Sequence, residues 1–120
     1  MRISFPYILT HNYSKKARSK AEKEKVSFKT LEPYVIEMIN EKWEDNEYTS
    51  SMWQAISGGH LREFVEILQH SPEAAHVRSS DGRGPMWWAH EYKRPKMVQV
   101  LKKLGVKETL VDANGRRPGE

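Results

Sequence analysis

Cysteine is absent from this 120-residue sequence. Disulfide frameworks, cysteine nucleophiles and thiolate zinc sites are therefore excluded. The sequence also has no apolar run that approaches the roughly 20 residues of a membrane-spanning helix, and its mean hydropathy is −0.79. We therefore expect a chain that does not cross a bilayer as written.

The short motifs that mark common catalytic sites are missing as well. There is no GxSxG, no phosphate-binding P-loop and no GxGxxG after a strand. The five histidines, His11, His60, His70, His76 and His90, do not form HExxH or another recognised metal-ligand spacing. The sequence thus predicts no enzyme activity, no metal, no cofactor and no small-molecule substrate.

Positive charge is concentrated near the N-terminus. Residues 1–29 carry eight basic and two acidic side chains, whereas the remainder carries 12 basic and 14 acidic ones. A basic arm on a nearly neutral body suggests an acidic partner for the arm. We therefore divide the chain into a basic N-terminal extension at 1–29, a capping helix at 30–48 and a repeat region at 49–120.

The arm combines apolar residues near its start with a lysine-rich stretch. We expect the apolar residues to fill grooves on a neighbour and the basic ones to meet an acidic surface; a solvated charge run without a partner is the simpler alternative. The candidate anchors are Phe5, Tyr7, Ile8, Leu9, Lys15, Lys16, Arg18 and Lys20.

The composition of the N-terminus also bears on location. The first 21 residues hold five basic side chains and no acidic one, which is typical of mitochondrial or plastid transit segments. The opening apolar patch is too short for a signal-peptide core, and no small-residue cleavage site closes it. We expect an intracellular protein, cytoplasmic or organellar, that is not secreted.

A helix is expected from about Leu31 to Asp45, with Thr30 as its N-cap. Its apolar stripe would cover the exposed apolar face of the helices that follow. Trp43, the last residue of the stripe, could instead anchor a partner. The stripe consists of Leu31, Val35, Met38, Ile39 and Trp43.

The stretch from Asp81 to Gly105 predicts a turn followed by two short antiparallel helices. Asp81-Gly82 asks for a reversal with positive φ at the glycine, and Pro85 suits a first helical position because it needs no amide donor. The helical pattern breaks at residues 93–95, resumes from Met97 and ends at Gly105, a typical C-terminal cap.

Parts of this pattern occur three times. Asn114-Gly115-Arg116-Arg117-Pro118 repeats Asp81-Gly82-Arg83-Gly84-Pro85, so that the two prolines are 33 residues apart. Upstream, Ser51-Met52-Trp53-Gln54-Ala55 corresponds to Pro85-Met86-Trp87-Trp88-Ala89, which lies 34 residues later. Gly58-Gly59-His60-Leu61 supplies a turn between helices. Pro72-Glu73-Ala74-Ala75 indicates a short helical turn inside the connection to the next unit.

A turn and two helices recurring at about 33 residues resembles the ankyrin repeat family. The resemblance covers about residues 50–118, with two repeats nearly complete and a third cut off after its opening turn. It implies an all-α fold, a short solenoid of paired antiparallel helices. Gly84 and Trp87 replace the threonine and histidine of the family's Thr-Pro-Leu-His motif. Lys93 replaces a glycine between helices, so we expect a left-handed conformation there.

The resemblance also implies where a partner binds. Ankyrin repeats contact proteins through their turn tips and the exposed side of each first helix. The corresponding residues here are Ser80, Asp81, Arg83, Glu91, Tyr92, Asn114 and Arg116. Arg83 and Tyr92 are the strongest of these candidates, because arginine and tyrosine supply large contacts at interfaces.

We therefore expect a non-catalytic protein–protein interaction module, an accessory or scaffold subunit of a larger complex anchored by its N-terminal arm. Two alternatives stay open: an RNA-associated subunit of a ribonucleoprotein particle, with the arm on phosphates, and a peripheral subunit of a membrane-protein complex. The incomplete third repeat further predicts that another chain covers Val100 and Leu101.

Overall fold

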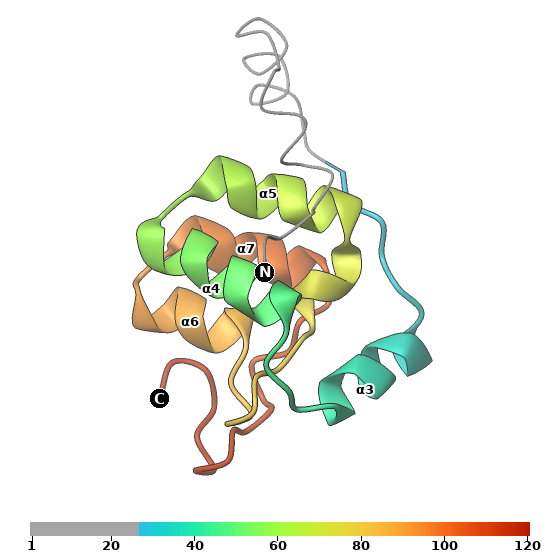
Figure 1. Ribbon diagram of the computed structural model, residues 1–120, viewed down its shortest axis with the longest axis vertical. Helices are drawn as coiled ribbons and strands as arrows, with labels where there is room; N and C mark the ends of the chain where they lie inside the picture. The colour runs from blue at the N-terminus through green and yellow to red at the C-terminus, as the bar shows by residue number, and fades with distance from the viewer. Residues whose placement is uncertain (1–26) are drawn as a thin grey trace, which may run out of the picture.

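The computed structural model describes residues 27–120, so the predicted arm anchors from Phe5 to Lys20 lie outside the described residues. Described residues form helices only, apart from an isolated bridge between Trp43 and Arg78, which confirms the all-α expectation. The elements, labelled as in Figure 1, are α3 (Pro33–Glu41), α4 (Glu47–Gly58), α5 (Leu61–His70), the 3₁₀-helix η2 (Pro72–Ala75), α6 (Pro85–Glu91) and α7 (Pro95–Lys103).

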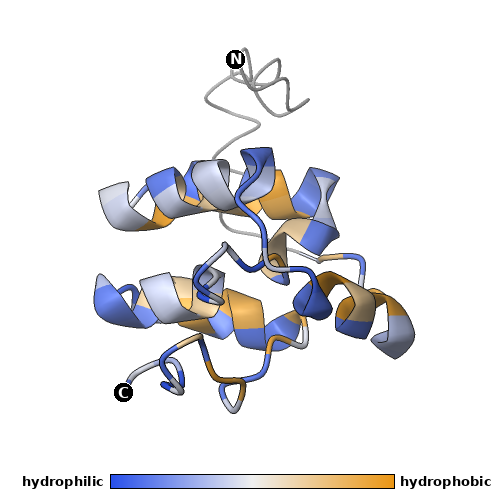
Figure 2. Ribbon diagram, turned by 60° about the horizontal axis from the view of Figure 1, so that its bottom comes forward, coloured by the Kyte–Doolittle hydropathy of each residue, from blue (hydrophilic) through white to orange (hydrophobic). Residues whose placement is uncertain are grey.

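Four helices make two pairs, α4 with α5 and α6 with α7, and the pairs pack on one another through α4 and α6. Figure 2 shows hydrophobic residues on the sides of these helices that face each other. Burying those sides is what stabilises helices too short to persist alone. The largest fully buried side chains are Phe64, Met52, Ile56, Ile67, Leu68, Met86, Leu101, Leu104 and Pro85.

The two turns between paired helices have the same backbone geometry. Gly59 and Lys93 both have positive φ, at 72° and 57°. In each turn the amide of the next residue donates to the carbonyl five residues before it, over 2.8 Å. Lys93 therefore adopts the left-handed conformation expected from its position, and the helix pairs repeat at a spacing of 34 residues.

The two Gly-containing turns that precede Pro85 and Pro118 also match. The Ser79 amide donates to the Arg83 carbonyl over 2.7 Å, and the Asp112 amide donates to the Arg116 carbonyl over 2.9 Å. The carbonyls of Ser79 and Asp112 each accept from a glycine amide three residues on, at 2.8 and 2.9 Å. The 33-residue spacing seen in the sequence is thus a repetition of backbone hydrogen bonds.

Helix α4 begins at Glu47, four residues before the stretch Ser51–Ala55 that the sequence analysis aligned with the start of α6, because Asn46 and Thr49 form a reciprocal cap. The Asn46 side chain accepts from the Thr49 amide at 3.0 Å, and the Thr49 hydroxyl accepts from the Asn46 amide at 2.8 Å. This cap satisfies amides at the helix N-terminus that would otherwise lack partners.

Helix α3 does not cover the first repeat as expected. It runs from Pro33 with Glu32, not Thr30, at its N-cap, and none of its residues is buried. Met38, assigned to the apolar stripe, is 64% exposed. The half-buried side of α3 carries Val35 and Ile39 of the predicted stripe together with Ile36, whose side chain lies beside Gly105, just after α7.

The C-terminal segment, residues 106–120, runs from α7 alongside the loop that precedes α6 and then turns back towards α6 (Figure 1). Leu101 is fully buried and Val100 is half-buried, and Val106 and Leu110 of this segment pack on the core. The expectation that another chain must cover Leu101 is therefore wrong. Within the described part of the chain, every helix is too short or too polar to cross a membrane.

Candidate functional site

A polar groove of about 390 Å³ lies between α6 and the C-terminal segment. It combines three arginines with three carboxylates and one histidine, so neither sign of charge dominates it. We call it the α6 groove. Its lining residues are Arg83, Trp87, His90, Glu91, Asp112, Asn114, Arg116, Arg117, Gly119 and Glu120.

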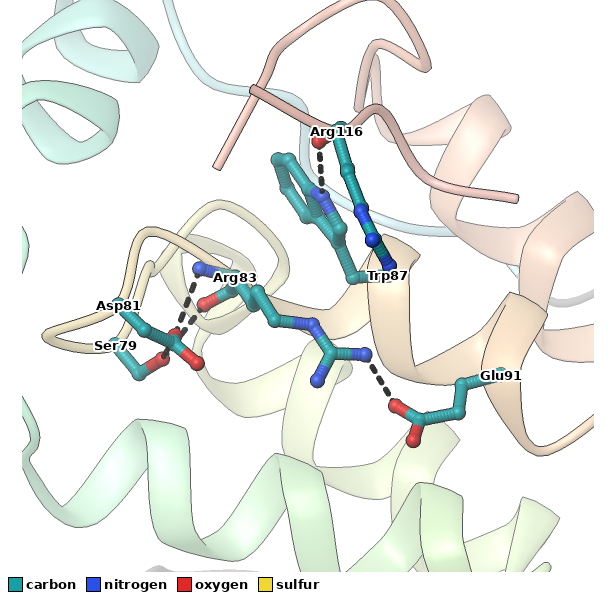
Figure 3. Close-up of polar contacts among 6 residues, drawn as sticks. All are labelled: Ser79, Asp81, Arg83, Trp87, Glu91 and Arg116. Atoms are coloured by element: carbon teal, nitrogen blue, oxygen red, sulfur yellow. Dashed lines mark hydrogen bonds and ion pairs between the residues drawn. The ribbon is translucent and has the colours of Figure 1, made fainter. Parts of the chain in front are cut away.

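The first wall of the α6 groove is the turn at residues 79–83 (Figure 3). The Asp81 carboxylate accepts from the Ser79 hydroxyl at 2.5 Å and from the Arg83 amide at 3.0 Å. Burial opposes ionisation of Asp81, but these hydrogen bonds outweigh it and hold the pKa of the carboxyl below its usual value. Asp81 therefore braces the turn from within.

Arg83 links this turn to α6. Its guanidinium donates to the Glu91 carboxylate and forms an ion pair with it (Figure 3). The Arg83 side chain is half-buried, and the Glu91 side chain is exposed. An exposed pair of this kind adds little to stability. Its main effect is to hold both charged groups at the mouth of the α6 groove in a fixed geometry.

The second wall is the turn at residues 112–116. The Trp87 indole Nε1 donates to the Arg116 carbonyl at 3.0 Å, which fixes this turn against α6 (Figure 3). The Asp112 carboxylate accepts from the amides of Asn114 and Arg116, at 2.8 and 3.0 Å. Arg117 Nε donates to the Glu120 carboxylate at 2.7 Å. The backbone that presents Arg116 to the groove is therefore well ordered.

His90 closes the groove on the α7 side. Its Nε2 lies 2.6 Å from the Glu108 carboxylate, whose other oxygen is 3.2 Å from the Lys102 ammonium. The hydrogen bond with His90, and then Lys102, lowers the pKa of Glu108. This contact ties the C-terminal segment to α6 and α7 together.

Both walls depend on Arg78, which is buried at 7% exposure. Its guanidinium lies between the rings of Trp43 and Trp87, at 4.6 and 5.0 Å from their centroids. Arg78 Nε donates to the Gly82 carbonyl at 2.8 Å, and the guanidinium also donates to the Val111 carbonyl. Burial lowers the pKa of Arg78, although Asp112 opposes the shift.

An aromatic pair with one exposed ring lies at the end of α6, where Tyr92 follows the groove residue Glu91. The rings of Trp53 on α4 and Tyr92 are 6.5 Å apart and nearly perpendicular, at 78°. Trp53 is 44% exposed, and Tyr92 is half-buried. Such edge-to-face pairs favour a fixed orientation of both rings.

The seven predicted binding residues separate into three groups. Arg83, Glu91, Asn114 and Arg116 meet in the α6 groove, and Tyr92 joins Trp53. The remaining two lie at the tip of the first turn, apart from the groove lining. There the Ser80 amide and hydroxyl donate to the Asp45 carboxylate, at 3.0 and 3.2 Å, and Asp81 is held inside its own turn.

Sequence reasoning missed Trp53, Arg78 and Arg117. Trp53 stands next to core residue Met52 and off its helical stripe, which is a usable signal for exposure. Nothing local marks Arg78, because its partners are backbone carbonyls and rings brought in from distant segments.

Within residues 27–120, no three histidine, aspartate or glutamate side chains lie close enough together to hold a metal ion. Comparisons of the chain with protein-family models, with curated proteins and with solved structures found no match.

Proposed function

We propose that this chain is a non-catalytic protein-interaction module of the ankyrin-repeat type, acting as an accessory or scaffold subunit of a larger assembly. Two repetitions support the proposal: the left-handed turns at Gly59 and Lys93, and the hydrogen-bonded turns closed at Arg83 and Arg116. Stacked units of this kind present their turns and first helices on one surface.

The observation that carries the proposal is the Trp53–Tyr92 pair beside the α6 groove. A tryptophan that is 44% exposed removes much apolar surface from water when a partner covers it. Tryptophan, tyrosine and arginine dominate the binding energy of protein interfaces. Because Tyr92 already orients the Trp53 ring, binding there loses little side-chain entropy.

The charges of the α6 groove indicate what kind of protein segment fits. Arginines and carboxylates both line its walls, so a partner with both signs of charge gains more than a uniformly acidic or basic one. We therefore expect a protein segment with an apolar anchor for Trp53 and neighbouring charged side chains of both signs for Arg116 and Glu91.

A photo-crosslinking experiment tests the proposal. A photoreactive phenylalanine analogue is placed at position 53 or 116 of the full chain, in cells that express it, and at the exposed α5 positions 63 or 69 as matched controls. We expect discrete protein adducts from positions 53 and 116 only. Adducts of equal yield from all four positions, or none from 53 and 116, would contradict it.

A substitution then measures the contribution of the ring. Trp53→Ala removes an exposed side chain, so the fold should persist, as checked by circular dichroism. Affinity for the crosslinked partner should fall by roughly 30-fold or more, the effect of losing an interface hot spot of about 2 kcal/mol. Gln69→Ala on α5 is the control and should leave affinity unchanged.

A further inference from the structure

One side of α3 is not covered by any described residue. Tyr34, Glu37, Met38 and Glu41 are all exposed and follow the i, i+3, i+4, i+7 spacing of a single helix face. Tyr34 and Met38 are 65% and 64% exposed. We call these four residues the outer face of α3. The opposite side of the helix is half-buried, so the helix has a defined orientation.

The segment just after α3 is tied to the body by several contacts. Just after α3, the Trp43 ring stacks on Arg78, and the Glu44 amide donates to the Arg78 carbonyl at 3.0 Å. Asp45 accepts from the Ser80 amide and hydroxyl. The two large apolar side chains of the outer face remain exposed to water, which favours a ligand that covers them.

Charge limits what that ligand is. Residues 27–48 contain six acidic and two basic side chains, and Glu37 and Glu41 flank the two exposed apolar residues. Such a surface repels nucleic acid and anionic lipid headgroups. It attracts a basic segment that also carries apolar side chains.

The chain itself contains such a segment immediately upstream. Residues 1–26 hold seven basic and two acidic side chains, with apolar residues from Phe5 to Leu9. Lys15 is twelve residues before Ser27, a reach of roughly 40 Å in an extended chain. A short tether gives the segment a high effective concentration at the helix, so weak contacts suffice.

We infer that residues 1–26 dock on the outer face of α3 in the same chain, with Lys15, Lys16 and Lys20 opposite Glu37 and Glu41. Apolar residues of the segment then cover Tyr34 and Met38. The acidic surface expected for the basic arm is thus supplied within the molecule. This contact is independent of the proposed function, because it uses neither the α6 groove nor Trp53.

Zero-length carbodiimide crosslinking of the full chain tests the inference. An equal mixture of isotope-labelled and unlabelled protein is crosslinked, and lysine–carboxylate links are identified by mass spectrometry. We expect links from Lys15, Lys16 or Lys20 to Glu37 or Glu41 within one isotopic form. They should be about tenfold more frequent than links to exposed Glu63 on α5, because a docked segment holds these lysines against α3 and away from α5.

A double variant, Tyr34→Ser with Met38→Ser, separates docking from simple charge attraction. Both side chains are exposed, so the fold should be retained, and the yield of the links should drop several-fold. Links that join the two isotopic forms would show a second copy on the face and overturn the inference. So would links no more frequent than those to Glu63, or an unchanged yield in the double variant.

Discussion

At the scale of single residues, Arg78 connects the parts that form the candidate site. It touches the segment after α3 through Trp43, the first turn through Gly82, α6 through Trp87 and the C-terminal segment through Val111. A buried arginine is rare unless it is fully paired, and here two backbone carbonyls and two aromatic faces replace water. No periodicity in the sequence reveals such a residue.

Replacing Arg78 should therefore destabilise the fold strongly. Arg78→Met fills similar space but leaves the carbonyls of Gly82 and Val111 without their donor, and we expect a loss of about 2–4 kcal/mol in the free energy of unfolding. Arg78→Lys should recover only part of the free energy of unfolding that Arg78→Met loses, because an ammonium lacks the planar fork that reaches both carbonyls. Urea denaturation measures both variants, and Lys103→Met at an exposed site is the control. A loss below about 0.5 kcal/mol for Arg78→Met would refute this role.

His76 gives the fold a dependence on pH. It is 3% exposed, and burial lowers its pKa from 6.5 to about 4, against a smaller opposing effect of the Leu104 backbone. Between those two values the unfolded chain binds a proton that the folded chain does not. The contribution of neutral His76 to the free energy of unfolding should therefore be fully present above about pH 6.5. It should be lost as the pH is lowered towards 4, by about 3 kcal/mol in all.

Urea denaturation at several pH values across this window measures the slope. His76→Gln removes the titrating group and should flatten it, whereas His70→Gln at an exposed position should leave it intact. The depressed pKa values of Asp81, Glu108 and Glu120 affect stability mainly below about pH 5, so the slope between about pH 5 and 6.5 reports His76. An identical slope in the His76 variant would contradict the prediction.

At the scale of elements, the sequence predicted what local chemistry determines. Pro85 begins α6 and Gly82, Gly59 and Gly105 have the positive φ that their turns require. The start of α4 was missed because its cap uses threonine where the capping-box pattern has glutamate or glutamine. Met38 was wrongly expected to be covered because apolar residues occur on more than one side of α3, and only packing selects which of them are shielded.

The repeated turn between paired helices allows a matched test of backbone strain. Lys93 has a φ of 57° where the equivalent residue is Gly59 at 72°. Lys93→Gly should stabilise the fold by about 0.5–1 kcal/mol, since relief of left-handed strain exceeds the added entropy of the unfolded chain. Gly59→Ala should cost about 1 kcal/mol. Thermal denaturation measures both, and equal signs for the two changes would refute the equivalence of the turns.

At the scale of the whole molecule, the sequence predicted an incomplete third repeat, but it did not predict how residues 106–120 pack against the helix pairs. Residues 106–120 provide only a turn, yet they give Arg78 and Trp87 the carbonyls of Val111 and Arg116 as acceptors. They also bring Glu108 to His90. Arg78 and Val111 are 33 positions apart in the sequence, and Trp87 and Arg116 are 29 positions apart. Local sequence patterns therefore did not indicate these contacts.

Removing this segment should therefore abolish more than its own few apolar contacts. A chain ending at Gly105 removes the Val111 acceptor from Arg78, which keeps only its hydrogen bond to the Gly82 carbonyl, and removes the Arg116 acceptor from the Trp87 indole. Each loss costs about 1–3 kcal/mol, and the truncation also uncovers apolar surface that Val106 and Leu110 now shield. Because small domains are stable by only about 5–15 kcal/mol, we expect loss of the cooperative unfolding transition. Deleting Glu120 alone is the control and should preserve the transition. If the chain ending at Gly105 unfolds as sharply as the full chain, the two helix pairs close their own end and the C-terminal segment is dispensable for the fold.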